Sequence, residues 1–133
     1  MSYLIDTNIF LEVFLGQEKS TECRRLLEQV SDGKIECTVT KFTVHAIEGL
    51  LTEDLDLIRQ FTNNLDSSTG LEIIDTSLKE EREIASNARD FDLDFDDSMQ
   101  LSVARKEGIE TIISLDSDFD KTSIERIEPS EVI

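Results

Sequence analysis

Short apolar runs alternate along this sequence with longer stretches whose apolar residues recur at helical spacing. A short apolar run bounded by polar residues is typical of a buried strand. Strands that alternate with helices usually form a mostly parallel sheet covered on both faces, so we predict an α/β fold with four or five strands flanked by helices. The predicted strands are Tyr3–Ile5, Lys34–Val39, Leu71–Ile74 and Thr111–Ser114, with a short edge strand at Arg126–Ile127.

The length of 133 residues suits one domain that spans positions 1–133, without repeats or a linker. Hydrophobic residues make up 38% of the chain, which predicts a globular protein. No apolar run approaches the roughly 20 residues needed to cross a bilayer, and no charged-then-apolar leader precedes the first strand. We therefore expect a cytoplasmic protein with no membrane partner. Cys23 and Cys37 are too isolated for a disulfide framework, so we expect reduced, half-buried thiols.

The charge balance is strongly acidic, because 30 Asp and Glu residues face 13 Lys and Arg residues and give a formal net charge of −17. This composition predicts a strongly solvated surface, suited for instance to a high-salt cytoplasm. It is equally compatible with a few carboxylates that bind metal. It argues against electrostatic binding of nucleic acid, which normally needs a basic surface.

Carboxylate side chains stand at the ends of predicted strands and at the start of a predicted helix. Asp6 directly follows the first strand, and Asp116 and Asp118 follow the fourth. Asp97 closes the acidic cluster FDLDFDD, which leads into a helix that ends at Gly108. Open α/β sheets bind their ligands just beyond the carboxyl ends of the strands, so we expect these carboxylates to converge.

Glu48 adds a carboxylate from the interior of a helix that begins at Thr40 or Thr43, close to the apolar stripe of that helix. A glutamate in such a position is usually a solvated surface residue, and that alternative stays open. His45 lies three residues before Glu48, so the two side chains can share a helix face. A structural role for this single histidine is favoured over a catalytic one, since a carboxylate metal site needs no histidine.

Each aspartate also has an ordinary structural interpretation. Asp97 alone is more often a helix N-cap, and Asp116 alone is more often a turn residue. Their combined arrangement favours a site, because carboxylates that face one another need a cation or must take up protons. Mg²⁺ and Mn²⁺ prefer oxygen ligands, so the sequence predicts a site for one of these ions.

The segments LIDTNIFLEVF, DFDDSMQLSVA and IISLDSDFD, together with Glu48, closely resemble the PIN domains and, within them, the VapC-like toxin ribonucleases. The resemblance spans nearly the whole chain, and its most specific parts are the opening L-I-D-T-N and the closing S-x-D-x-D-F. It implies a catalytic quartet of Asp6, Glu48, Asp97 and Asp116, metal ligands Asp6, Asp97, Asp116 and Asp118, and supporting polar residues Thr7, Asn8 and Ser114. Asp96 is the alternative to Asp97 as a ligand, and Asp118 is the alternative to Asp116.

The resemblance implies a Mg²⁺- or Mn²⁺-dependent endoribonuclease that hydrolyses RNA phosphodiester bonds and leaves a 5′-phosphate and a 3′-hydroxyl. It also implies the toxin of a toxin–antitoxin pair, a homodimer, and a cognate antitoxin protein that inserts a segment into the acidic groove. The helices around Glu12–Val30 and Thr43–Phe61 carry apolar residues that could serve these contacts. Basic residues available for the RNA backbone are few, namely Lys41, Arg89, Arg105 and Lys106. The alternative is a catalytically weak PIN-like module that binds RNA or protein in RNA processing, which the net charge slightly favours.

Overall fold

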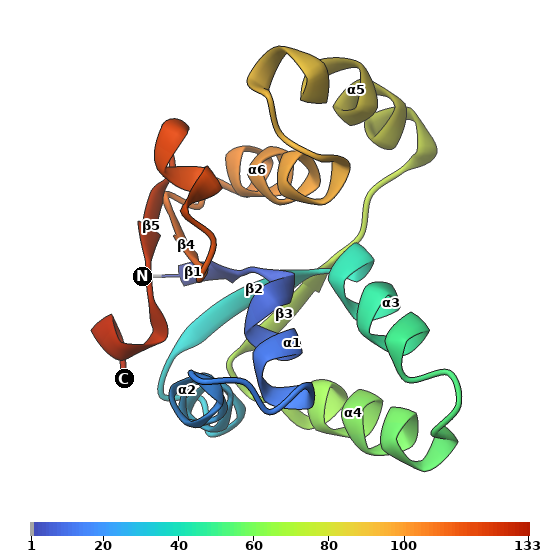
Figure 1. Cartoon of the computed structure of the whole chain (residues 1–133), viewed down its shortest axis with the longest axis vertical. Helices are drawn as coiled ribbons and strands as arrows, with labels where there is room; N and C mark the ends of the chain where they lie inside the picture. Colours follow the sequence, from blue (N-terminus) through green and yellow to red (C-terminus); the bar gives the residue numbers. More distant parts are fainter. Residues whose placement is uncertain (1) are drawn as a thin grey trace.

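The chain forms a five-stranded sheet in the order β3-β2-β1-β4-β5, as seen in a computed structural model that describes residues 2–133 (Figure 1). Every neighbouring pair of these strands is parallel. The strands are β1 (Ser2–Ile5), β2 (Glu36–Thr40), β3 (Leu71–Ile74), β4 (Thr111–Ile113) and β5 (Glu125–Ile127). The predicted α/β fold with a parallel sheet is confirmed, and the predicted edge strand pairs with β4.

Helices cover both faces of the sheet. One face carries α1 (Thr7–Phe14), α2 (Ser20–Ser31), α3 (Lys41–Leu50) and α4 (Leu55–Ser67), and the other carries α5 (Leu78–Ala88) and α6 (Phe95–Glu107) (Figure 1). Short 3-10 turns are η1 (Arg89–Phe91), η2 (Ser117–Lys121) and η3 (Pro129–Glu131). In residues 2–133, no helix combines the length and the apolar character needed to cross a bilayer.

Each face of the sheet packs its own hydrophobic core. Side chains alternate between the two faces of a strand, so the neighbours Leu4 and Ile5 of β1 enter different cores. Ile5 packs in the cluster formed with α1 to α4, and Leu4 packs with Met99 and Val103 of α6. Both β1 side chains are fully buried. The strand that leads to Asp6 is therefore held from both sides.

β1 also lies where the order of the strands reverses. The chain builds outwards from β1 through β2 to β3, and then returns to place β4 on the other side of β1. Leu4 is in register with Thr38 of β2 and Ile112 of β4, so the three strands end at one edge of the sheet. Such a reversal point opens a crevice beyond the strand ends, which is the usual ligand site of an open α/β sheet.

The start of α6 places two carboxylates at this edge. Asp94 is the N-cap residue, and its carboxylate accepts a 2.8 Å hydrogen bond from the backbone N–H of Asp97. Asp96 and Asp97 lie in the first turn, where the positive end of the helix dipole favours negative charge. Gly108 ends the helix with a φ of +68°, as the sequence predicted. The N-cap interpretation of Asp97 does not hold, because Asp94 fills that position.

The two cysteines are more deeply buried than expected. Cys23 and Cys37 are free thiols that are 0% and 2% exposed. Burial raises the pKa of Cys23 to about 11 and that of Cys37 to about 12. Because the thiolate is the reactive form, both residues act as small core residues.

Candidate metal centre

Asp6 lies immediately beyond β1 and is 3% exposed. Its carboxylate accepts a 2.6 Å hydrogen bond from the hydroxyl of Ser114, the residue that follows β4. The side-chain amide of Asn8 donates to the same hydroxyl at 3.3 Å and accepts from the backbone N–H of Leu115 at 3.3 Å. These bonds fix the carboxylate of Asp6 between the ends of two adjacent strands.

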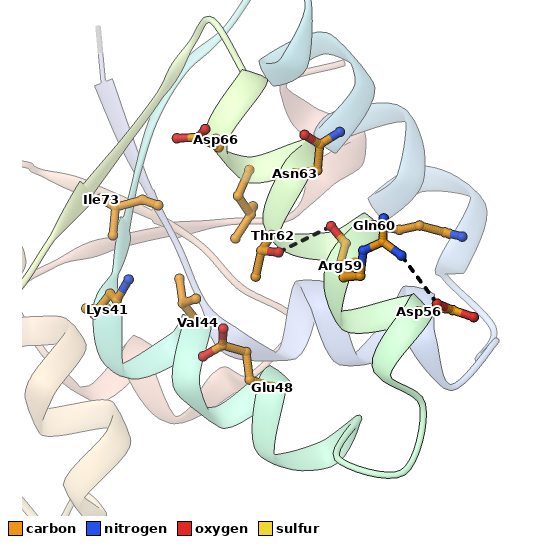
Figure 2. Close-up of a pocket in the computed structure, with 11 residues that line it drawn as sticks. Lys41, Val44, Glu48, Asp56, Arg59, Gln60, Thr62, Asn63, Asp66 and Ile73 are labelled. Atoms are coloured by element: carbon orange, nitrogen blue, oxygen red, sulfur yellow. Dashed lines mark hydrogen bonds and ion pairs between the residues drawn. The ribbon is translucent and has the colours of Figure 1, made fainter.

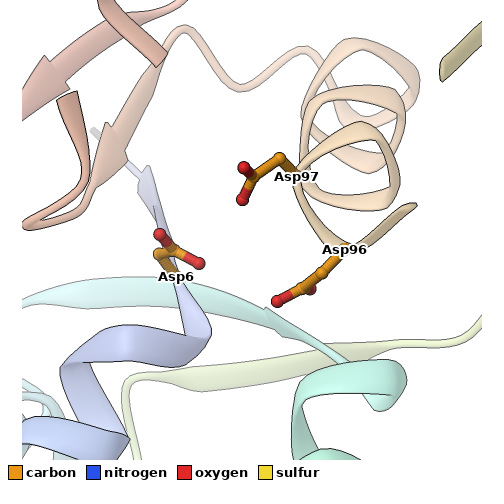
Figure 3. A group of neighbouring side chains, drawn as sticks. All are labelled: Asp6, Asp96 and Asp97. Atoms are coloured by element: carbon orange, nitrogen blue, oxygen red, sulfur yellow. The ribbon is translucent and has the colours of Figure 1, made fainter. Parts of the chain in front are cut away.

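Three aspartates meet at this point. Asp6, Asp96 and Asp97 each offer one carboxylate oxygen, and these oxygens lie within 4.8 Å of one another. Figure 3 shows the side chain of Asp6 at the end of β1 directed towards the two side chains from the first turn of α6. Residues far apart in sequence are thus brought together by the parallel sheet and the helix that packs on it.

A second acidic group extends from the first. Asp97, Asp116 and Asp118 also each offer an oxygen within 4.8 Å of the others. Asp116 accepts a 2.9 Å hydrogen bond from the backbone N–H of Asp118, and its own N–H donates to the Ser114 hydroxyl at 2.9 Å. Asp116 therefore stabilises a turn, as its ordinary interpretation predicted, and at the same time belongs to the acidic cluster. Asp97 is the member that joins the two groups.

The environment of the cluster opposes ionisation. Burial, followed by the nearby charges of Asp94 and Asp6, raises the pKa of Asp97 to about 7. Burial also raises the pKa of Asp6 to about 6, although the hydrogen bond from Ser114 acts in the opposite direction. The pKa of Asp96 is likewise raised, mainly by burial. Unpaired carboxylates that approach one another in a buried place favour protons or a cation.

The donor set fits a hard divalent cation. None of the ion pairs formed among residues 2–133 involves Asp6, Asp96 or Asp97. Both acidic groups consist of aspartates alone. All-oxygen sites suit Mg²⁺ or Mn²⁺, whereas zinc and copper sites usually include imidazole or thiolate. These residues can therefore hold Mg²⁺ or Mn²⁺.

Glu48 lies outside both acidic groups. Its carboxylate forms a 2.8 Å contact with Nδ1 of His45, which confirms that the two side chains share a face of α3. Glu48 lines an open groove of about 850 Å³ between α3 and α4, together with Lys41 and Arg59 (Figure 2). In the part of the chain that the structure describes, Asp96 is the carboxylate that meets Asp6 and Asp97.

A family model for the PIN domain matches residues 3–125 of this chain. The chain belongs to the PIN domain family. PIN domains as a family are nucleases, and the resemblance seen in the opening and closing motifs of the sequence is confirmed. No curated protein gives a significant match to the sequence.

Solved structures of toxins and of toxin–antitoxin complexes share the fold of this PIN domain. VapC20 from Mycobacterium tuberculosis, a toxin that cleaves the sarcin–ricin loop, aligns with a TM-score of 0.74 at 17% identity, over 96% of this chain and 99% of that chain. A toxin–antitoxin complex from Klebsiella pneumoniae gives 0.70 at 18% identity, with 96% and 97% covered. VapBC2 from Rickettsia felis, bound to a DNA fragment from its promoter, gives 0.65 at 18% identity, with 96% and 98% covered.

The geometry of the PIN domain explains why α3 does not bring Glu48 to the cluster. The inward face of the helix is marked by Thr43, whose hydroxyl lies 2.7 Å from that of Thr7. Glu48 follows five residues later, which rotates its side chain by about 140° from Thr43 around the helix. Val44 and Ile47, the apolar neighbours of Glu48 on the helix, pack in the hydrophobic core. The N-cap residue Thr40 fixes where α3 begins, and therefore the direction of each side chain around the helix axis, since its hydroxyl accepts a hydrogen bond from the backbone N–H of Thr43.

The supporting polar residues lie where they can act on the PIN domain site. Thr7 begins α1 beside Asp6, and its hydroxyl lies 3.5 Å from the carboxylate of Asp96.

Sequence reasoning missed Gln100, which lies one helical turn after Asp96 and is 0% exposed. An uncharged polar residue among the apolar positions of α6 was the available signal. Its side chain contacts Thr7, Thr43 and Asp96.

Proposed function

We propose that this PIN domain is a Mg²⁺- or Mn²⁺-dependent endoribonuclease and the toxin of a toxin–antitoxin pair. The observation that carries the proposal is the meeting of Asp6, Asp96 and Asp97 at the carboxyl edge of the sheet. Two buried carboxylates and one half-buried carboxylate, all with raised pKa values, are costly to the fold unless a cation compensates them. A protein that only binds partners has no need for such a cluster.

The aspartates take distinct parts in this proposal. Asp6 and Asp97 are the principal metal ligands, and Asp96 is the third carboxylate, in the place for which the sequence suggested Glu48. Asp116 either completes the ligand set or orients the attacking water, and the exposed Asp118 extends the set towards solvent. When bound there, Mg²⁺ or Mn²⁺ neutralises the scissile phosphodiester and acidifies a water molecule.

The remaining polar side chains hold the ligands in place. Ser114 donates to Asp6, and Asn8 links Ser114 to the backbone of Leu115. Fixed orientation of ligands by neighbouring hydrogen bonds commonly changes metal affinity by about 10- to 100-fold. Thr7, Asn8 and Ser114 therefore support the site without binding the cation themselves.

RNA is the proposed substrate because VapC20, which shares the fold, cleaves the sarcin–ricin loop. The net charge of −17 makes a metal ion more important here than in a basic nuclease, since no broad basic surface can attract the backbone. Two of the four basic residues expected to contact the RNA backbone already interact with other side chains of this protein. Lys106 pairs with Glu80 at 3.0 Å, and the guanidinium of Arg105 lies 5.3 Å from the centre of the Phe91 ring.

An antitoxin protein is the proposed partner, since the structures from Klebsiella pneumoniae and Rickettsia felis are toxin–antitoxin complexes. An apolar groove of about 610 Å³ between α1, α2 and α4 supports this assignment, and Phe14, Leu27 and Phe61 are among the residues that line it. Basic residues of an antitoxin segment would also be attracted to the acidic crevice. A homodimer that supplies basic residues from a second copy remains part of the proposal.

The test is an RNA digest with and without Mn²⁺, at low and at high salt. We expect cleavage by the wild-type protein only with Mn²⁺, and none by Asp6→Asn. Asp32→Asn is the matched control, because it removes the same charge from an exposed position at the end of α2, remote from the cluster. Equal cleavage by Asp6→Asn and wild type would disprove the assigned site. The absence of cleavage under all conditions would favour the alternative of a binding module.

A further inference from the structure

A buried polar cluster lies directly behind the acidic site. It consists of Thr7 at the start of α1, Thr40 and Thr43 at the start of α3, and Gln100 in α6, and each is at most 6% exposed. Three separate elements therefore contribute polar side chains to one small region that an ordinary α/β core would fill with apolar groups. A fully buried polar group needs hydrogen-bond partners, so its contacts indicate what it does.

Gln100 is the centre of this cluster. Its side-chain nitrogen, Nε2, lies 2.9 Å from the hydroxyl of Thr43 and 3.2 Å from the hydroxyl of Thr7. It also lies 3.4 Å from Oδ1 of Asp96, one helical turn earlier. The two threonine hydroxyls are bonded to each other at 2.7 Å, and the hydroxyl of Thr40 donates to Thr43 at 3.1 Å.

The orientation of the Gln100 amide follows from the charge that it faces. An ionised carboxylate accepts hydrogen bonds only, so the donor end of the amide must point towards Asp96. The opposite orientation would place two oxygen acceptors against each other at this distance. The cost is visible at the other end of the amide, where Oε1 of Gln100 is buried and has no hydrogen-bond partner among residues 2–133. A leucine of similar volume would avoid that cost, so stability alone does not explain a glutamine here.

Asp96 depends on this cluster for its orientation. The carboxylate of Asp6 is anchored by Ser114, whereas that of Asp96 receives hydrogen bonds only from Thr7 and Gln100 among the described residues. Without these two donors the Asp96 side chain would be free to turn away from Asp6 and Asp97, since aspartate has several rotamers and Asp96 is only partly buried.

We propose that Gln100 is a positioning residue that, together with Thr7 and Thr43, holds the Asp96 carboxylate towards Asp6 and Asp97 for the metal ion. The inference rests on the metal site of the proposed function. Gln100 acts through Asp96 and does not touch the cation or the substrate. The cluster thereby does for the carboxylate of Asp96 what Ser114 does for the carboxylate of Asp6.

The experiment compares Gln100→Leu with the wild type by titration with Mn²⁺, followed by the electron paramagnetic resonance signal of free Mn²⁺. We expect the dissociation constant for Mn²⁺ to rise by about 10- to 100-fold. The melting temperature without metal should stay the same or rise, because the unpartnered oxygen is removed. A purely structural role predicts the reverse pattern, namely a lower melting temperature and an unchanged Mn²⁺ affinity of the folded protein. Thr43→Val, which removes one hydroxyl with little change in volume, serves where Gln100→Leu does not fold.

A double-mutant cycle separates action through Asp96 from other effects. In the Asp96→Asn background, the further change Gln100→Leu should leave the Mn²⁺ affinity unchanged within about twofold. Val103→Ala is the control, because Val103 is buried in the same helix but packs in the apolar core. This control should lower the melting temperature and leave the affinity as it is. A full additional loss in the double variant would show that Gln100 acts independently of Asp96, which overturns the inference.

The results also distinguish the two proposals. A wild-type protein that binds no Mn²⁺ at millimolar concentration overturns the metal site, and with it the role of Gln100. If the wild-type protein binds Mn²⁺ and the Gln100→Leu variant binds it equally well, only the positioning role is overturned. In that case the proposed ribonuclease function is retained, and the Asp96 side chain keeps its orientation without the hydrogen bond from Gln100.

Discussion

The hydroxyl of Ser114 donates a 2.6 Å hydrogen bond to the carboxylate of Asp6, and so joins the end of β4 to the end of β1. The same hydroxyl accepts from the backbone N–H of Asp116. One small side chain therefore connects the carboxylate that follows β1 to the acidic turn that follows β4. Any loosening of this contact affects members of both acidic groups at once.

Replacement of Ser114 by alanine should weaken metal binding more than it weakens the fold. Asp6 loses its anchoring donor, so its pKa should rise further and protons should compete better with the cation. We expect about a tenfold loss of Mn²⁺ affinity at pH 7 and a loss of unfolding free energy of about 1 kcal/mol. Calorimetric titration and urea denaturation measure the two quantities. An unchanged affinity would indicate that the Asp6 carboxylate needs no anchor.

The metal-free protein should be more stable at pH 5 than at pH 8. The pKa values of Asp6 and Asp97 are about 6 and about 7, against 3.8 for an unperturbed aspartate, so the folded state holds protons that the unfolded chain has released. Stability from this source is complete below pH 4 and disappears as the pH rises through 6 and 7. We expect the melting temperature to fall by about 5 °C or more between pH 5 and pH 8.

Thermal melts across this pH range, repeated with Mn²⁺, measure the effect. Metal binding requires ionised carboxylates, so the rise in melting temperature caused by Mn²⁺ should be larger at pH 8 than at pH 5. The lowered pKa values of Glu80, Asp120 and Glu128 do not interfere, because those groups titrate below this range. A flat profile without metal would contradict the raised pKa values.

Asp97→Asn should stabilise the metal-free protein and abolish the response to metal. Asp97 is the member shared by the two acidic groups, so its neutral substitute removes repulsion from several neighbours. We expect the melting temperature at pH 8 to rise by a few degrees, and millimolar Mn²⁺ to leave it unchanged. RNA cleavage should be lost while the circular dichroism spectrum is kept. A drop in stability would be evidence that the carboxylates do not repel one another.

A comparison of two variants tests whether Asp96 or Glu48 is the third carboxylate of the metal site. Asp96 lies within the cluster, whereas Glu48 contacts His45 on α3. We expect Asp96→Asn to weaken Mn²⁺ binding by at least about tenfold, and Glu48→Gln to retain affinity and cleavage within about twofold. Loss of cleavage in Glu48→Gln would instead support the catalytic role that the sequence suggested for this residue.

Much of this arrangement follows from local sequence patterns. The strand Leu71–Ile74 forms as predicted, and Ser77 starts α5 through a capping box with Glu80. The position of Asp6 at the carboxyl edge of a parallel sheet could be predicted from the order of the elements, together with the rule that open α/β sheets bind ligands beyond the carboxyl ends of their strands. These features depend on contacts between residues near in sequence, or on a general constraint of topology.

The features that sequence did not reveal depend on the rotational phase of helices and on buried contacts. The side chain of Glu48 is placed by the phase of α3, which the cap at Thr40 determines. The role of Asp94 as the N-cap of α6 shifts Asp97 into the first turn, where it can reach Asp6. The polar side chain of Gln100 among the apolar positions of α6 was the only local signal, and its two threonine partners, 57 and 93 residues away in the chain, could not be read from the sequence.

The position of β4 beside β1 has a consequence for synthesis. β1 leaves the ribosome well before its second neighbour, because Leu4 pairs with Ile112, which lies 108 residues later in the sequence. The carboxylates of Asp96 and Asp97 likewise emerge more than 85 residues after Asp6. A nascent chain that stops before β4 has neither a complete sheet nor an assembled acidic centre. An acidic centre that lacks Asp116 and the Ser114 hydroxyl is incomplete, so assembly of the proposed metal site waits for β4 to join the sheet.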